Sequence, residues 1–243
     1  MKDKDAIIHL EDVWKIYKMG DVEVAALQGL NLTIKRGEFV SIMGPSGSGK
    51  STAVNMVGCL DVPTKGRILL NGKDISNMSE SSLAQVRGKL IGFIFQQFNL
   101  IPTLTAKENV MLPMMFQDIP RDQRIKKAEA LLQKVELGDR MDHKPAELSG
   151  GQQQRVAIAR SLANNPEVIL ADEPTGNLDS KTGTIVMEFL RKMHIEEGKT
   201  IIMVTHDERV AKAADRIEYL RDGVIIKSQN SKIKHDHVKR GGP

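Results

Sequence analysis

A glycine-rich loop between a predicted strand and a predicted helix constrains the fold of this chain more than any other feature. The loop reads Gly-Pro-Ser-Gly-Ser-Gly-Lys-Ser over residues 44–51, after the apolar run Phe39–Met43 and before helical spacing over 52–60. Glycines let successive backbone N–H groups turn inward, and the N-terminus of the following helix adds the positive end of its dipole. The pattern therefore predicts a cradle for phosphate groups.

Three side chains of this segment have predicted roles toward a bound nucleotide. Lys50 can reach the β- and γ-phosphates, Ser51 offers a hydroxyl to Mg²⁺, and Thr52 adds a contact to the α-phosphate. The other nucleotide-binding residues predicted in the loop are Gly44, Pro45, Ser46, Gly47, Ser48 and Gly49. Because a short motif also recurs by chance, its interpretation depends on the rest of the chain.

Composition excludes several classes of protein. The 243 residues are 40% hydrophobic and 27% charged, which is typical of a globular chain with one large domain or a domain with an inserted subdomain. No apolar run approaches the roughly 18 to 20 residues that span a bilayer, and residues 1–5 lack an apolar signal core. We therefore expect a cytoplasmic protein, unless another chain holds it at a membrane. Cys59, the only cysteine, is interpreted as a core residue.

The net charge of +4 comes largely from the end of the chain. The basic residues there are Lys227, Lys232, Lys234, Lys239 and Arg240. We interpret residues 228–243 as a solvated polar tail. Contact with nucleic acid or anionic lipid is the alternative, but no aromatic residues alternate with the basic ones as in single-strand binders, and no nucleic-acid partner is expected.

Alternation of apolar and polar residues predicts an antiparallel β layer ahead of the glycine loop, with strands over 7–17, 24–27 and 30–34. Tyr17, near the end of the first strand, has two equally supported interpretations. It is either a half-buried strand residue or an exposed ring on which an adenine stacks. After the loop helix, Asn71-Gly72 predicts a type I′ hairpin turn.

A strand over 91–95, preceded by a helix over 79–89, ends at Gln96. Strand carboxyl ends face the ligand in α/β folds, so Gln96 is placed to touch a metal ion or an attacking water. A glutamine that only satisfies loop backbone is the alternative, and the residue alone favours it. From about residue 105 helical spacing takes over. The apolar run 111–116 in this helical part is either core or a groove for a partner helix.

A second cradle is predicted at Leu-Ser-Gly-Gly-Gln, residues 148–152, which opens a helix to about residue 163. Ser149 is a good N-cap, Gly150 and Gly151 bare the backbone, and the helix dipole is positive there. The alternative, a capping box of a core helix, would not need two glycines. One ATP needs one cradle, so we interpret Ser149–Gln152 as contacting the γ-phosphate of an ATP bound to another copy of the chain.

The apolar strand predicted from Val168 ends in two acids, Asp172 and Glu173. Asp172 is placed to hold the Mg²⁺ shell, and Glu173 to take a proton from an attacking water, although adjacent acids are often only a solvated turn. The strand over 200–204 delivers His206, which either caps the following helix or hydrogen-bonds a γ-phosphate oxygen. A final hairpin is predicted over 216–227.

Taken together, these motifs make the chain similar to the ATP-binding subunit of an ABC transporter, to about Lys227. The matching positions are Tyr17 (adenine-stacking aromatic), Gly44 to Ser51 (Walker A), Gln96 (Q-loop), Leu148 to Gln152 (signature), Asp172 and Glu173 (Walker B), Asp179 (D-loop) and His206 (switch histidine). The resemblance favours the functional interpretations of Tyr17, Gln96 and His206. It implies that Lys50, Gln96, Glu173 and His206 are catalytic, that Ser51, Gln96 and Asp172 hold Mg²⁺, and that Asp179 contacts nucleotide.

The resemblance also implies an α/β P-loop NTPase fold. One domain would combine a RecA-like core with an antiparallel β subdomain, over 1–96 and 151–227, and an inserted α-helical subdomain over 97–150. Two copies would form a homodimer around two ATP, with Ser149 and Gly151 of one subunit capping the γ-phosphate held by Lys50 of the other. Hydrolysis of ATP to ADP and phosphate would then reopen the dimer.

The segments Asp-Glu-Pro-Thr-Gly-Asn-Leu-Asp and Phe-Gln-Gln-Phe-Asn-Leu look most like ATPases of lipoprotein-release, macrolide-export and antimicrobial-peptide transporters. In that subgroup the partner is a separate transmembrane permease, which would hold the chain peripherally on the inner face of the cell membrane. A non-transport ABC ATPase of DNA repair or translation is the alternative, and it is expected to carry a long coiled coil or two cassettes. A module that holds ATP without turnover is expected to lose Glu173 and His206.

Overall fold

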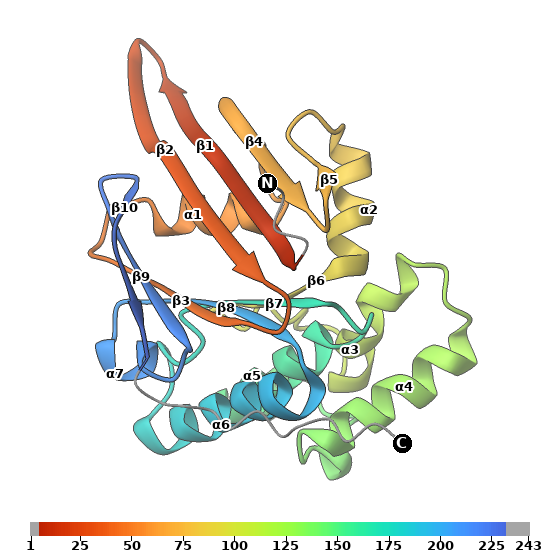
Figure 1. The fold of residues 1–243 in the computed structure, drawn as a ribbon. Helices are drawn as coiled ribbons and strands as arrows, with labels where there is room; N and C mark the ends of the chain where they lie inside the picture. Colours follow the sequence, from red (N-terminus) through yellow and green to blue (C-terminus); the bar gives the residue numbers. More distant parts are fainter. Residues whose placement is uncertain (1–4, 232–243) are drawn as a thin grey trace, which may run out of the picture.

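The central element of the fold is a six-stranded sheet with strand order β10-β9-β3-β8-β7-β6 (Figure 1). The computed structural model describes residues 5–231. The parallel strands are β3 (Phe39–Met43), β6 (Ile91–Ile94), β7 (Val168–Asp172), β8 (Thr200–Thr205) and β9 (Arg216–Arg221). β10 (Val224–Asn230) pairs with β9 in the antiparallel sense and forms the edge. The sheet is thus parallel except at one edge strand.

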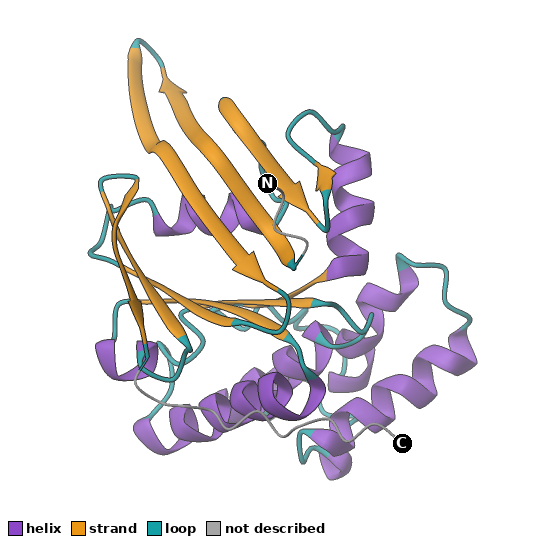
Figure 2. Ribbon diagram, in the orientation of Figure 1, coloured by secondary structure: helices purple, strands orange, loops and turns teal. Residues whose placement is uncertain are grey.

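Both faces of this sheet are buried. Side chains of successive strand residues point to opposite sides, so each strand contributes to an apolar cluster on either face. In β8, Ile202 and Val204 pack in one apolar cluster, whereas Ile201 and Met203 pack in the other. The first cluster includes residues of α1 (Lys50–Val57), of the antiparallel sheet and Leu83, whereas the second includes the buried residues of the long helices that follow residue 105. Figure 2 shows the resulting layers, with α1 between the two sheets and most of the helices on the far side.

The antiparallel sheet has strand order β2-β1-β4-β5. Its strands are β1 (Ala6–Met19), β2 (Val22–Lys35), β4 (Lys65–Leu70) and β5 (Lys73–Asp74). The prediction of two short strands over 24–27 and 30–34 was wrong, since β2 is continuous. Gly29 adopts a φ of 79° inside it, near a shift in the register between β1 and β2, so the glycine marks a bulge. The predicted turn is confirmed by positive φ at both Asn71 (51°) and Gly72 (73°).

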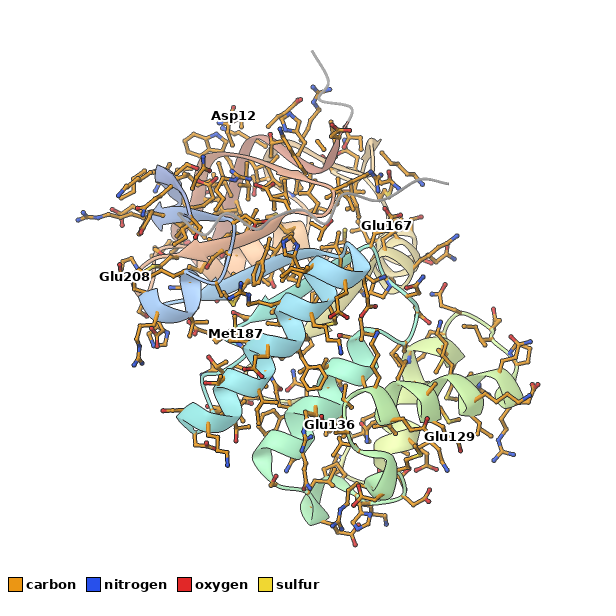
Figure 3. The ribbon with its side chains drawn as sticks, turned by 60° about the horizontal axis from the view of Figure 1, so that its bottom comes forward. Asp12, Glu129, Glu136, Glu167, Met187 and Glu208 are labelled. Atoms are coloured by element: carbon orange, nitrogen blue, oxygen red, sulfur yellow. The ribbon has the colours of Figure 1, made fainter. Side chains whose placement is uncertain are left out.

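The helical part of the chain contains α3 (Ala106–Met115) and α4 (Arg121–Lys134), followed by the short turns η1 (Gly138–Arg140) and η2 (Pro145–Glu147). Thr105 and Glu108 form a capping box at the start of α3. Ala128 and Leu132 of α4 are fully buried, so one face of this helix packs in the core. In Figure 3, Glu129 marks α4 and Met187 marks the long helix α6 (Ser180–Glu197). The boundaries 1–96, 97–150 and 151–227 of the subdomains stay a prediction.

The remaining helices flank the sheet. These are α2 (Glu80–Leu90), capped by Ser79, α5 (Gly150–Ser161) and the short α7 (Glu208–Ala211). Cys59 is fully buried, and its burial raises the pKa of the thiol to about 12, which makes the thiol unreactive. Its interpretation as a core residue is confirmed. Within residues 5–231 no helix is long and apolar enough to cross a membrane.

The structure differs from the predictions for two segments, the tail over 228–243 and the apolar run over 111–116. The predicted tail begins too early, because residues 228–230 belong to β10; its part from Lys232 onward lies outside the described residues. The run 111–116 is divided between core and surface, and its interpretation as a groove for a partner helix stays a prediction. Met114 is fully buried in the helical core, whereas Phe116 is 80% exposed.

Candidate active site

The active-site side chains converge because the carboxyl ends of neighbouring parallel strands meet at one edge of the sheet. β3 leads into the glycine loop, β7 ends in Asp172 before Glu173, and β8 ends just before His206. β6, next to β7, is followed by Gln96. Strand order rather than chain order thus assembles four of the predicted motifs at a single edge.

The glycine loop has the backbone that a phosphate cradle requires. Gly47 and Gly49 adopt left-handed φ values of 78° and 97°. A Cβ at Gly44 would overlap the carbonyl oxygen of Leu220, so only glycine fits there. A cavity of about 420 Å³ lies between this loop, the start of β2 and the turn at Gly223. Its lining includes Ser46, Gly47, Lys50, Ser51 and Thr52.

Helix α1 is capped differently from the other helices near the site. Its N-cap is Gly49, which offers no side-chain acceptor to the N-terminal amides, whereas Ser149 caps α5 and Asp179 caps α6. The free amides of α1 are the donors that an anion would satisfy. The Lys50 ammonium lies over the loop and donates to the carbonyl oxygens of Gly44 (2.8 Å) and Pro45 (2.7 Å). Cavity, amides and ammonium together fit a polyphosphate.

The second predicted cradle has its own cavity, which shares no lining residue with the first. The Ser149 hydroxyl accepts from the Gln152 N–H, and the Gln152 side chain accepts from the Ser149 N–H. The capping box considered from the sequence is therefore present. A Cβ at Gly151 would overlap the Thr182 methyl group, so this glycine allows α5 to approach α6. Binding of a phosphate by Ser149, Gly150, Gly151 and Gln152 stays a prediction.

The carboxyl group of Asp172 is half-buried at the end of β7. Burial raises its pKa, and the neighbouring Glu173 raises it further, while Lys50 acts in the opposite direction. The ionised side chain therefore costs folding free energy at neutral pH. The effect of Lys50 on this pKa also shows that Lys50 and Asp172, 122 positions apart in the chain, are electrostatic neighbours.

We expect Asp172→Asn to raise the melting temperature of the nucleotide-free protein at pH 7. A raised folded-state pKa means that the wild type loses stability as pH rises through that pKa, and the amide avoids this loss. The gain should shrink as pH falls toward the ordinary value of 3.8. Thermal unfolding at pH 4 and pH 7 measures it.

Asp179→Asn is a control for this prediction, because it should change the melting temperature in the opposite direction. Hydrogen bonds from Thr182 lower the pKa of Asp179, so its replacement should lose stability above the ordinary value. An Asp172→Asn melting temperature equal to or below that of the wild type at pH 7 would contradict the assignment of Asp172 as an acid whose ionised form is destabilised by burial.

Glu173 is held in an unusual conformation beside His206. Its φ is 46°, and its N–H donates to the carbonyl oxygen of Val204 at 2.9 Å. The His206 ring donates from Nδ1 to Glu173 Oε1 at 2.7 Å. Thr205, which the sequence did not single out, donates from its hydroxyl to Glu173 Oε2 at 3.2 Å. The carboxylate is thus bound through both oxygens, as a positioned acceptor of a proton would be.

Gln96 is exposed and lies against the loop that follows Glu173. The backbone carbonyl oxygen of Gln96 accepts from the Asn177 side chain at 2.9 Å. A Cβ at Gly176 would come within 2.8 Å of the Gln96 side-chain nitrogen Nε2. Arg160, at the end of α5, donates to the carbonyl oxygen of Phe98 at 2.8 Å. Asn177 and Arg160 tie this segment to its neighbours, and the sequence assigned no individual role to either of them.

Asp179 and Tyr17, which were predicted to bind the nucleotide, each make hydrogen bonds to other residues of the chain. Asp179 caps α6 by accepting from the N–H groups of Lys181 and Thr182. Tyr17 is half-buried, donates to Asp61 Oδ2 at 3.2 Å and does not line the 420 Å³ cavity. Its cross-strand partner Val24 does line it. Adenine stacking by Tyr17 and nucleotide contact by Asp179 stay predictions.

Comparison with known proteins decides the family. The sequence profile described as ABC transporter matches residues 27–176. The chain belongs to this family. An uncharacterised ABC transporter ATP-binding protein of Methanocaldococcus jannaschii, MJ1508, is 56% identical over 224 residues, covering 92% of the chain and 100% of the relative. The macrolide export ATP-binding/permease protein MacB of Brucella melitensis is 52% identical, covering 94% of the chain but 35% of the relative.

Solved structures of other cassettes confirm the fold. The dimeric post-hydrolysis state of the ATP-binding cassette MJ0796 with ADP and Pi superposes with a TM-score of 0.85 at 52% identity, covering 92% of this chain and 98% of that one. CbiO1 of Clostridium perfringens gives a TM-score of 0.82 at 32% identity, with coverages of 93% and 89%. The predicted P-loop NTPase fold and ABC ATPase class are therefore confirmed. The chain spans about a third of the length of MacB and nearly all of MJ1508.

Proposed function

We propose that this cassette hydrolyses ATP as a homodimer, with each ATP held between the glycine loop of one copy and the Ser149–Gln152 segment of the other. The observation that supports this most is the separation of the two cradles within one chain, since they line different cavities. The related cassette MJ0796 is described as dimeric. A second copy supplies what one copy lacks.

We further propose that Mg²⁺ is bound with the nucleotide by Ser51, Gln96 and Asp172. Hydroxyl, amide and carboxylate oxygens are the donors that this hard cation prefers. Within residues 5–231 no group of three or more His, Cys, Asp and Glu side chains could hold a metal alone, so phosphate oxygens would complete the shell. The adjacent acids Asp172 and Glu173 fit a cation, which would supply charge neutralisation at the phosphates.

In the proposed reaction Glu173 accepts a proton from the attacking water, because its carboxylate is already oriented at the strand edge. His206 holds one oxygen of that carboxylate and is placed to contact the γ-phosphate. Lys50 and the amides of α1 bind and orient the phosphates. Phosphoryl transfer depends mainly on positioning and charge stabilisation, so closure of the dimer would complete the catalyst.

The proposed partner is a transmembrane permease of the macrolide- or lipoprotein-export type, which would hold the cassette at the inner face of the cell membrane. A cavity of about 640 Å³ lies between α2, β6 and α3, close to Gln96. Apolar side chains dominate its walls, including Leu60, Phe93, Phe95, Leu112, Pro113 and Phe116. Phe116 is 80% exposed, so the groove presents an aromatic anchor to a partner helix.

We expect Phe116→Ser to weaken binding of the proposed permease partner by at least roughly tenfold, because it removes the most exposed aromatic anchor of the groove. Co-purification in detergent and permease-stimulated ATPase activity measure the effect, while ATPase activity without permease should be unchanged. Ile195→Ser, at a 48% exposed site on α6, is the matched control. Equal permease binding by both variants would reject this groove as the docking site.

A further inference from the structure

The Thr205 hydroxyl is committed by its surroundings to donate toward Glu173. Thr205 is the last residue of β8 and is 1% exposed. Its Oγ1 accepts the Asp207 N–H at 3.1 Å, and it donates to Glu173 Oε2 at 3.2 Å. A hydroxyl carries a single proton. Because the backbone amide can only donate, the proton of Thr205 is free to bind the carboxylate.

The backbone of Glu173 is fixed as firmly as its side chain. Its N–H bonds to the Val204 carbonyl, and its own carbonyl accepts the Gly176 N–H at 3.0 Å. Asp172 pairs with Val204 in the β7–β8 register, which sets Thr205 one residue beyond. The carboxylate therefore leaves a rigid backbone beside a rigid donor.

The two groups that bind this carboxylate differ in their freedom. The side chain of His206 is 71% exposed, whereas Thr205 is enclosed in the strand. An exposed ring can rotate without disturbing any packing, but a buried threonine on a strand cannot. The fixed contact is thus the one to Oε2, and Oε1 is left to His206 or to a water.

We infer that Thr205 is a positioning residue for ATP hydrolysis, which aims the Glu173 carboxylate by holding Oε2. This inference rests on the proposed role of Glu173 as the proton acceptor. Thr205 is 1% exposed and its hydroxyl donates to Glu173, so we expect it to act through Glu173 alone. Loss of the donor would leave the carboxylate with one mobile partner.

Thr205→Val tests the inference, because valine keeps the shape and removes the hydroxyl. We expect kcat for ATP hydrolysis to fall roughly tenfold, as for a lost hydrogen bond to a charged group, with KM for ATP unchanged within about twofold. Thr205→Ser, which retains the donor, should restore kcat to within about twofold of the wild type. Should the valine variant fail to fold, Thr205→Ala compared with Thr205→Ser gives the same contrast.

Thr200→Val is the matched structural control, since Thr200 is 2% exposed at the other end of β8 and its hydroxyl accepts the Gly37 N–H at 2.9 Å. Its kcat should match the wild type even where its melting temperature falls. A wild-type kcat in Thr205→Val, equal losses of kcat in Thr205→Val and Thr200→Val, or no rescue by serine would overturn the inference.

The double variant Glu173→Gln with Thr205→Val separates this inference from the proposed function. If Thr205 acts through Glu173, the valine substitution should cause no further loss of kcat in a chain that already carries Glu173→Gln. A further tenfold loss would overturn the inference and leave the role of Glu173 intact. Wild-type turnover by Glu173→Gln alone would instead reject the proposed function itself.

Discussion

Replacing Glu173 by glutamine is expected to slow ATP hydrolysis by ~10²–10⁴, equivalent to about 3 to 5 kcal/mol of barrier, while ATP binding is retained. Glutamine has the size of glutamate but cannot take a proton from water. The strand-end position, the φ of 46° and the contact with His206 all place this carboxylate for that step. Single-turnover hydrolysis measures the rate, and titration with ATP measures binding.

The same variant should accumulate as a dimer when ATP is present, because the sandwich closes but does not reopen. Size-exclusion chromatography with and without ATP measures this. Glu80→Gln is a matched control, since Glu80 is an exposed acid in the first turn of α2. Near-normal turnover would remove Glu173 from the role of proton acceptor. A variant that stays monomeric at high concentrations of protein and ATP would contradict the shared site.

Lys50→Ala is expected to weaken ATP binding by roughly 10- to 100-fold, the range for charge-assisted hydrogen bonds to phosphate. The ammonium donates to the Gly44 and Pro45 carbonyl oxygens at 2.8 and 2.7 Å, which holds it over the loop where a phosphate would bind. The Lys50 ammonium also partly offsets the charge of Asp172, and the alanine substitution removes this positive charge. Calorimetric titration with ATP and Mg²⁺ measures the change.

Lys126→Ala provides the control for the loss of one positive charge, because Lys126 is exposed on α4 and away from both cradles. Its ATP affinity should equal that of the wild type. Unchanged affinity and ATPase kinetics in Lys50→Ala would reject the glycine loop as the phosphate cradle.

Local patterns predicted most elements of this fold, because the apolar strands and the capped helices carry strong local signals. The exception is β2, which was predicted as separate strands over 24–27 and 30–34, whereas the pairing with β1 tolerates Gly29 as a bulge. Strand order could not be predicted from spacing alone. Only tertiary pairing places β8 between β3 and β7 and so brings His206 to Glu173.

Within the site, the residues that the sequence missed are those whose partners depend on tertiary structure. Thr205 reads as an ordinary strand former, and its partner Glu173 lies 32 positions away. Asn177 reads as a turn residue, yet it binds the Gln96 carbonyl across 81 positions. The contact of Gly151 with Thr182 likewise explains a glycine that the sequence assigned to phosphate binding alone.

The contact between Asn177 and Gln96 joins parts of the molecule that face different neighbours. Gln96 lies close to the apolar groove, and Asn177 precedes Asp179, which binds Thr182 at the start of α6. Thr182 in turn presses against Gly151 at the start of α5. The segment after β6 and the Ser149–Gln152 segment are thus linked through neighbouring residues that do not line the 420 Å³ cavity.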